Sequence, residues 1–195
     1  MTIIQKTEEN WLEKQLELCG VDYFDFYLFH CMNHEGYEKH KRCNTFDIVK
    51  KLKSQGKIKH IAMSFHDTAD VLDEILTKHP EMEFVQLQIN YLDYDDPNVQ
   101  SEACYNVAVK HGKKVMVDMI EVPDLAERAA EIDAMGVDYI CVHTAFDVQK
   151  TGKDPLDDLK VVNKVLKHAK SAVAGGVKLN TIDAIVEEGA EIIVV

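Results

Sequence analysis

Five side chains that can bind ligands or move protons stand at or near the ends of short apolar runs. They are His30, Ser64, Gln88, Asp118 and His143. If the runs are parallel strands, their C-terminal ends meet at one edge of a sheet, and these side chains should ring one mouth of the fold. Acids and imidazoles at such a mouth are suited to proton transfer. We weigh two interpretations: a working site, or side chains that point inward without sharing a substrate.

A second cluster, "HCMNHEGYEKHKRC", contains the ligand types that zinc prefers. Cys31 with His34 and His40 with Cys43 form two closely spaced pairs. The short stretch between the pairs leaves little chain for folding four ligands around one ion. We therefore expect a solvated loop and no metal site, with these four residues as the candidates if zinc binds.

The elements that would position these residues follow from the hydrophobic pattern. Strand-like apolar runs recur roughly every 20–35 residues, separated by helical periodicity, which is typical of βα units around a parallel sheet. The pattern predicts a minimal (β/α)8 barrel of the TIM type, forming a single domain over residues 1–195. A doubly wound open sheet is the alternative, but no glycine-rich phosphate turn follows an early strand. The expected strands are Thr2–Gln5, Tyr23–His30, Ile58–Ser64, Phe84–Asn90, Lys114–Met119, Tyr139–Thr144, Ala172–Gly175 and Glu191–Val195.

The expected last strand has no helix after it. The outer faces of the last and first strands would then lack cover, because a barrel strand normally packs one face against the helical layer. We expect a homo-oligomer through the uncovered last strand, a swapped element, or an edge prone to aggregation.

Bulk properties limit the classes of partner. The net charge of −12 disfavours nucleic acid and anionic membrane surfaces as partners. No apolar run is long enough to span a bilayer, and the N-terminus does not resemble a signal peptide. Five cysteines without a CxxC pair favour reduced thiols and a cytoplasmic location.

Residues from about 9 to 112 resemble the aldo-keto reductases, in particular the bacterial branch that carries iron–sulfur clusters. The resemblance rests on "LEKQLELCGVDYFDFYLFH", "GKIKHIAMSFHDT" and "FVQLQINYLDYDDPNVQSEACYNVAVKHGK". It implies that His30 matches the family histidine near the substrate oxygen, and that Ser64 and Gln88 match positions that hold the nicotinamide. The family tyrosine and aspartate have no counterpart here, and the elements that bind the adenosine phosphate are absent. We therefore expect no working NADPH-dependent reductase.

From about residue 114 the chain resembles 3-hexulose-6-phosphate synthase, which condenses formaldehyde with ribulose 5-phosphate. The matching text is "VMVDMIEVPDLAERAAEIDAMGVDYICVHTAFDVQKTGKDPLDDLK" followed by "AVAGGVKLNTI". The resemblance implies that His143 handles a proton, that Asp118 has a counterpart, and that Gly175 and Gly176 begin a phosphate-binding turn. The family's Asp-x-Lys-x-x-Asp array, which supports enolate formation with magnesium, does not occur here.

Two half-barrel resemblances within one chain suggest a chimera, most simply an engineered one. Its halves would be residues 1–112 and 113–195, with "KKVMVDMIEVPD" at the junction. We expect a TIM-barrel scaffold without efficient catalysis and without a cofactor. Magnesium or NADPH would bind only if a parental activity survives. One alternative is a residual aldehyde-lyase-type enzyme or a binder of phosphate or a sugar phosphate. A second is an NADPH-dependent oxidoreductase.

Overall fold

The computed structural model describes residues 3–89 and 96–194, with side chains described from residue 11 onward. Helices and strands alternate along nearly the whole chain. The strands are β1 Phe24–Met32, β2 Ile58–Phe65, β3 Phe84–Leu87, β4 Lys114–Asp118, β5 Tyr139–His143, β6 Lys170–Ala174 and β7 Ile192–Val194. The helices are α1 Ile3–Cys19, α2 His34–Cys43, α3 Thr45–Ser54, α4 Ala69–Lys78, α5 Ser101–Lys110, α6 Leu125–Ala134, α7 Phe146–Gln149, α8 Pro155–Asn163 and α9 Ile182–Glu187.

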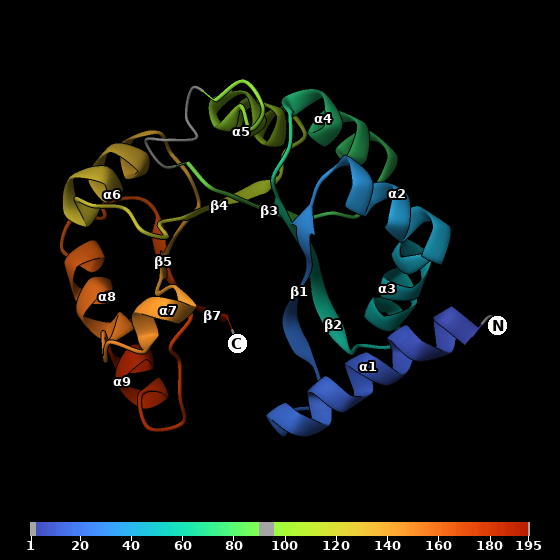
Figure 1. Ribbon diagram of the computed structural model, residues 1–195, viewed down its shortest axis with the longest axis horizontal. Coiled ribbons are helices and arrows are strands. Elements are labelled where there is room, and N and C mark those ends of the chain that lie inside the picture. Colours follow the sequence, from blue (N-terminus) through green and yellow to red (C-terminus); the bar gives the residue numbers. More distant parts are fainter. Residues whose placement is uncertain (1–2, 90–95, 195) are drawn as a thin grey trace.

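The seven strands form one parallel sheet whose order follows the sequence from β1 to β7. The sheet curls into an incomplete ring with the helices on its outside, and β1 and β7 stand on either side of the opening (Figure 1). Parallel strands joined by outer helices are the architecture of a TIM-type barrel. The predicted fold class is therefore confirmed.

The prediction of a first strand at Thr2–Gln5 is wrong. Residues 3–5 form the first turn of α1, and Thr2 lies outside the described residues. The run of two isoleucines continues into a helix whose buried side includes Leu12 and Leu16, four residues apart. Burial of that helical stripe outweighs the local preference of Ile3 and Ile4 for strand. In the described part of the chain the sheet consequently has seven strands.

Side chains of the strands point alternately to the helices and to the interior of the ring. The larger core lies between sheet and helices and includes Ile61, Val117 and Ile140. A smaller cluster lies on the inner face and includes Phe84, Met116, Cys141 and Ala172, with Phe26 packed against it. Polar residues follow these apolar layers at the C-terminal strand ends, where Asp118 ends β4 and His143 ends β5.

Local signals explain where several helices begin. Asp154 accepts a hydrogen bond from the backbone N–H of Leu156, and Pro155 takes the first helical position of α8. Asp124 caps α6 in the same manner, accepting from Glu127 N–H at 3.2 Å. These two helices position the loops that follow β4 and β5.

Among the described residues, no helix is both long enough and apolar enough to cross a membrane.

Candidate functional site

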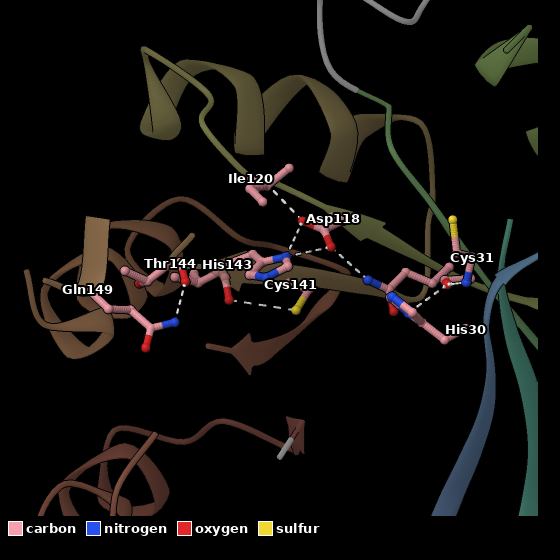
Figure 2. Close-up of polar contacts among 11 residues, drawn as sticks. His30, Cys31, Asp118, Ile120, Cys141, His143, Thr144 and Gln149 are labelled. Atoms are coloured by element: carbon pink, nitrogen blue, oxygen red, sulfur yellow. Dashed lines mark hydrogen bonds and ion pairs between the residues drawn. The ribbon is translucent and has the colours of Figure 1, made fainter. Parts of the chain in front are cut away.

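Asp118 and His143 form the centre of the site. Asp118 is the last residue of β4 and His143 the last of β5, and the two strands are neighbours in the sheet. His143 Nδ1 lies 2.8 Å from Asp118 Oδ2 and 3.1 Å from Oδ1 (Figure 2). Since an ionised carboxylate can only accept, Nδ1 carries the shared proton and Nε2 is the nitrogen able to exchange a proton with a ligand.

Two further donors fix the Asp118 carboxylate. The side-chain amide of Gln86 donates to Oδ2 at 2.7 Å, and the backbone N–H of Ile120 donates to Oδ1 at 2.9 Å. The Asp118 side chain is only 4% exposed, so these bonds replace the water that the carboxylate loses on burial. The carboxylate is thereby held in one orientation toward His143.

The environment of His143 favours its charged form. The hydrogen bond that His143 donates to Asp118, aided by the negative charge of the carboxylate, raises the pKa of His143, although partial burial of the ring acts in the opposite direction. The imidazole is 31% exposed and therefore accessible to a ligand. A histidine with a raised pKa can serve as a general acid near neutral pH and as a base after losing its proton.

Gly175 and Gly176 follow β6 beside this pair. Both have left-handed backbone conformations, with φ of +70° and +74°. A Cβ at Gly175 would lie 2.3 Å from the Thr144 carbonyl oxygen and 3.3 Å from His143 Cδ2. Only glycine therefore allows the turn to approach β5 this closely. A backbone site for an anion needs such positions, because no side chain then covers the N–H groups.

His30 and Ser64 form a separate contact on β1 and β2. Ser64 Oγ lies 3.5 Å from His30 Nδ1 and accepts the backbone N–H of Cys31 at 2.7 Å (Figure 2). His30 is exposed, whereas Ser64 is buried. The structure thus places both at the C-terminal strand ends, where they contact each other and the Cys31 backbone.

Gln86, which sequence reasoning missed, contacts Asp118, whereas the predicted Gln88 follows the end of β3. Gln86 and Gln88 are two residues apart in "FVQLQIN" and share a strand face, so alternation alone could have pointed to both. β3 ends at Leu87, and the carbonyl of Gln88 accepts the hydroxyl of Ser101 at 2.7 Å. Only Gln86 lies within the strand beside Asp118.

Cys31 lies at the end of β1 and the other three zinc candidates lie on a helix, so the prediction of a solvated loop is wrong. Residues 34–43 form α2, which Asn33 caps by accepting from Gly36 N–H. His40 packs against the Phe29 ring, with centroids 5.0 Å apart, and burial lowers its pKa. No group of three potential metal ligands occurs among the described residues, so Cys31, His34, His40 and Cys43 do not assemble a centre there.

The residues present do not fit the magnesium or the nicotinamide of the two resembled families. The Asp118 oxygens already accept from Gln86, Ile120 and His143, and the described residues supply no three-ligand group around it. Ser64 Oγ is engaged by the Cys31 amide. We therefore derive no chemical step through either cofactor.

Comparison with known proteins matches residues 5–120 to the aldo/keto reductase family. The chain belongs to the aldo/keto reductase family. The match includes β1 to β4 and therefore His30, Ser64 and Gln86. The resemblance of the first half of the sequence to aldo-keto reductases is confirmed at the level of the family.

This aldo/keto reductase family member is also similar to 3-hexulose-6-phosphate synthases. The synthase of Staphylococcus epidermidis is 51% identical over 94 residues, which are 48% of this chain and 45% of that protein. The chain thus matches less than half the length of that relative. The second resemblance is confirmed as a similarity, while the joining of two halves stays a prediction.

Two solved structures of 3-hexulose-6-phosphate synthase resemble the whole fold. The enzyme from Salmonella typhimurium has a TM-score of 0.62 and 29% identity, over 77% of this chain and 69% of that one. Another structure of the synthase has a TM-score of 0.64 and 25% identity, over 94% of this chain and 84% of that one. The backbone similarity therefore extends well beyond the 94 residues matched by sequence.

Proposed function

We propose that the chain is a TIM-barrel-type scaffold in which a reductase-like half, residues 1–112, joins a synthase-like half, residues 113–195. We further propose that its mouth binds a sugar phosphate. The observation that carries this proposal is the Asp118–His143 pair beside the Gly175–Gly176 turn. The similarity to 3-hexulose-6-phosphate synthases supports a phosphorylated sugar as the ligand class.

The proposed roles follow from the geometry. The backbone of Gly175 and Gly176 would hold the phosphate, since left-handed glycines leave space for an anion next to N–H groups. His143 would exchange a proton with the sugar through Nε2 while Asp118 holds Nδ1–H. The acid–lysine–acid array that stabilises the enolate in the synthases has no counterpart in the sequence. We therefore expect binding to persist and aldol condensation with formaldehyde to be slow.

Thermal unfolding with ribulose 5-phosphate tests the proposal. A ligand present at a hundred times its dissociation constant should add about 2.7 kcal/mol to stability, so even modest affinity is measurable. We expect a rise in the melting temperature that His143→Gln reduces. The matched control is His34→Gln, which changes an exposed histidine on α2. If ribulose 5-phosphate leaves the melting temperature unchanged, sugar-phosphate binding is contradicted. Only the scaffold part of the proposal would then remain.

The same scan with NADPH tests the second candidate, an oxidoreductase. The family match over residues 5–120 favours it. We expect no shift, because the proton-donating tyrosine and the adenosine-phosphate elements are missing from the sequence. A saturable shift with NADPH alone would reverse the order of the two candidates.

A further inference from the structure

The side chain of Gln149 lies between the end of β5 and the glycine turn that follows β6. Gln149 is the last residue of α7, and its Nε2 donates to the carbonyl oxygen of Thr144 at 3.0 Å (Figure 2). A Cβ at Gly175 would lie 3.1 Å from the same Nε2, and a Cβ at Gly176 would lie 3.6 Å from Gln149 Cγ. One side chain therefore packs against both the residue after His143 and the two glycines of the proposed phosphate site.

The glycine turn offers free backbone donors. Among the described residues, the N–H groups of Gly175 and Gly176 contact no backbone carbonyl, whereas the N–H of Thr144 donates to the carbonyl of Ala174. Successive N–H groups in a tight turn form a concavity that suits an anion. The turn therefore has donors to spare for a phosphate.

The carbonyl of Thr144 is the unfavourable group beside this turn. Its oxygen would lie only 2.3 Å from a Cβ at Gly175. A carbonyl oxygen carries partial negative charge and repels a nearby anion, more strongly where burial lowers the effective dielectric constant. The hydrogen bond from Gln149 Nε2 offsets this partial charge. Only the amide nitrogen can play this part, because the amide oxygen is an acceptor.

We propose that Gln149 is a positioning residue, which offsets the charge of the Thr144 carbonyl and thereby makes the Gly175–Gly176 turn selective for a phosphate dianion. This inference rests on the proposed sugar-phosphate site and names the residue that lets the turn accept a doubly charged group. Gln149 acts through the carbonyl and the turn, so it is not itself a catalytic residue. Methionine in its place would keep the length of the side chain but leave the carbonyl without its donor. Glutamate would add a second negative group beside the anion.

NMR titration of the full chain with ribulose 5-phosphate at pH 8 tests the proposal. We expect saturable shifts of the Gly175 and Gly176 amide resonances in the wild-type protein. Gln149→Met should weaken binding about fivefold, the effect of one ordinary hydrogen bond. Gln149→Glu should weaken it further, because the carboxylate repels the phosphate. Gln55→Met and Gln55→Glu, at an exposed position after α3, are the matched controls and should bind as the wild type does.

A second ligand separates this role from a merely structural one. Ribulose 5-sulfate has the same tetrahedral group with a single negative charge, whereas the phosphate ester is mostly doubly charged at pH 8. Gln149→Met should therefore weaken binding of the phosphate more than binding of the sulfate. Equal weakening for both ligands would mean that Gln149 only supports the fold of the turn, which overturns the proposal. Gln149→Leu provides the same comparison if Gln149→Met does not fold.

The titration also distinguishes failure of this inference from failure of the proposed function. If the wild-type protein binds ribulose 5-phosphate and both Gln149 variants bind it equally well, the role of Gln149 is refuted while sugar-phosphate binding stands. If the wild-type protein shows no saturable shift, sugar-phosphate binding is refuted, and the role of Gln149 with it.

Discussion

At the scale of single residues, Asp118 controls the charge of His143. Asp118→Asn removes the negative charge and weakens the bond to Nδ1, while the partial burial of the ring remains. We therefore expect the raised pKa of His143 to fall in the variant, because burial, which lowers the pKa, then acts without the opposing charge. An NMR titration of the His143 ring protons measures this directly. Asp157→Asn, at an exposed acid on α8, should leave the His143 pKa unchanged.

The loss of stability caused by the same substitution should depend on pH. The folded-state pKa of His143 is raised, so its contribution is complete below the unfolded-state value and is lost as pH rises through the folded-state value. The loss in unfolding free energy on Asp118→Asn should be about 2 kcal/mol near pH 5.5 and smaller near pH 8.5. Urea denaturation at both pH values provides the comparison. An equal loss at both would mean that the pair is not charged in the folded protein.

Gly175 allows a second prediction at this scale. An alanine there would suffer both the left-handed φ of +70° and a Cβ placed 2.3 Å from the Thr144 carbonyl oxygen. Gly152 has φ of +86° with nothing within 4 Å of its Cβ position, so Gly152→Ala suffers only the backbone strain. We expect Gly152→Ala to cost about 1 kcal/mol and Gly175→Ala at least about 2 kcal/mol in urea denaturation. If both substitutions lowered the unfolding free energy equally, the backbone around Gly175 would be able to move away from β5 without penalty.

At the scale of elements, Asp133 ties α6 to the loop before β6. Its buried carboxylate accepts the backbone N–H groups of Lys167, His168 and Ala169 at 3.0, 3.0 and 2.7 Å. Burial alone would raise the pKa of Asp133, but the three donors outweigh it and lower the pKa. The stabilisation is therefore present above the unfolded-state value and is lost as pH falls through the lower folded-state value.

Removing this carboxylate should loosen the loop more than the helix. We expect Asp133→Ala to reduce the unfolding free energy by on the order of 3 kcal/mol, because it leaves three backbone donors unpaired, of which that of Ala169 is buried. Hydrogen exchange at the Ala169 amide should accelerate at the same time. Glu127→Ala, at an exposed position on the same helix, is the control. Unchanged exchange at Ala169 would contradict the proposed tie.

The elements also show what the sequence could predict. The apolar run of β4 ends at Asp118 much as periodicity predicts, because a strand buried on both faces has a simple pattern. Ile3 and Ile4 favour a strand locally, but the helical stripe that includes Leu12 decides the conformation of the segment. The Gln86–Asp118 bond joins residues 32 positions apart and depends on strand register, which local pattern does not supply.

The candidate site was predictable in part for the same reason. Asp118, His143 and Gly175 follow consecutive strands, so a parallel sheet necessarily brings them to one end. Which atoms contact one another depends on side-chain direction and on the turn after β6. The zinc candidates show the opposite case: Cys31 lies in β1, whereas the other three lie on α2, where His40 packs against Phe29.

At the scale of the whole molecule, the curled sheet has two free edges. In the described residues β1 and β7 each pair on one side only (Figure 1). Leu28 and Val194, on the inner faces of these two strands, are half-buried. Unpaired backbone groups beside apolar side chains favour strand-to-strand association. We propose that a second copy of the chain covers these edges.

Sedimentation equilibrium over a range of concentrations tests this proposal. We expect association that Leu28→Lys weakens, because a charge on the inner face of β1 opposes burial by a second copy. Val186→Lys, on the outer side at α9, is exposed and serves as the control. A protein that sediments as a monomer at every concentration would refute association through these edges, as would equal weakening by both variants.

The sequential strand order has a consequence for how the chain folds. Each strand pairs with the strands immediately before and after it in the sequence, and no pairing joins β1 to β7 in the described sheet. The mean sequence separation of sheet contacts is therefore low, and each described strand can pair as soon as its neighbour in the sequence has formed. The fold can grow by adding one βα unit at a time, as a repeat array does, while the chain leaves the ribosome. Protection of amides against exchange should accordingly be greatest in β3 to β5 and decline toward both edges.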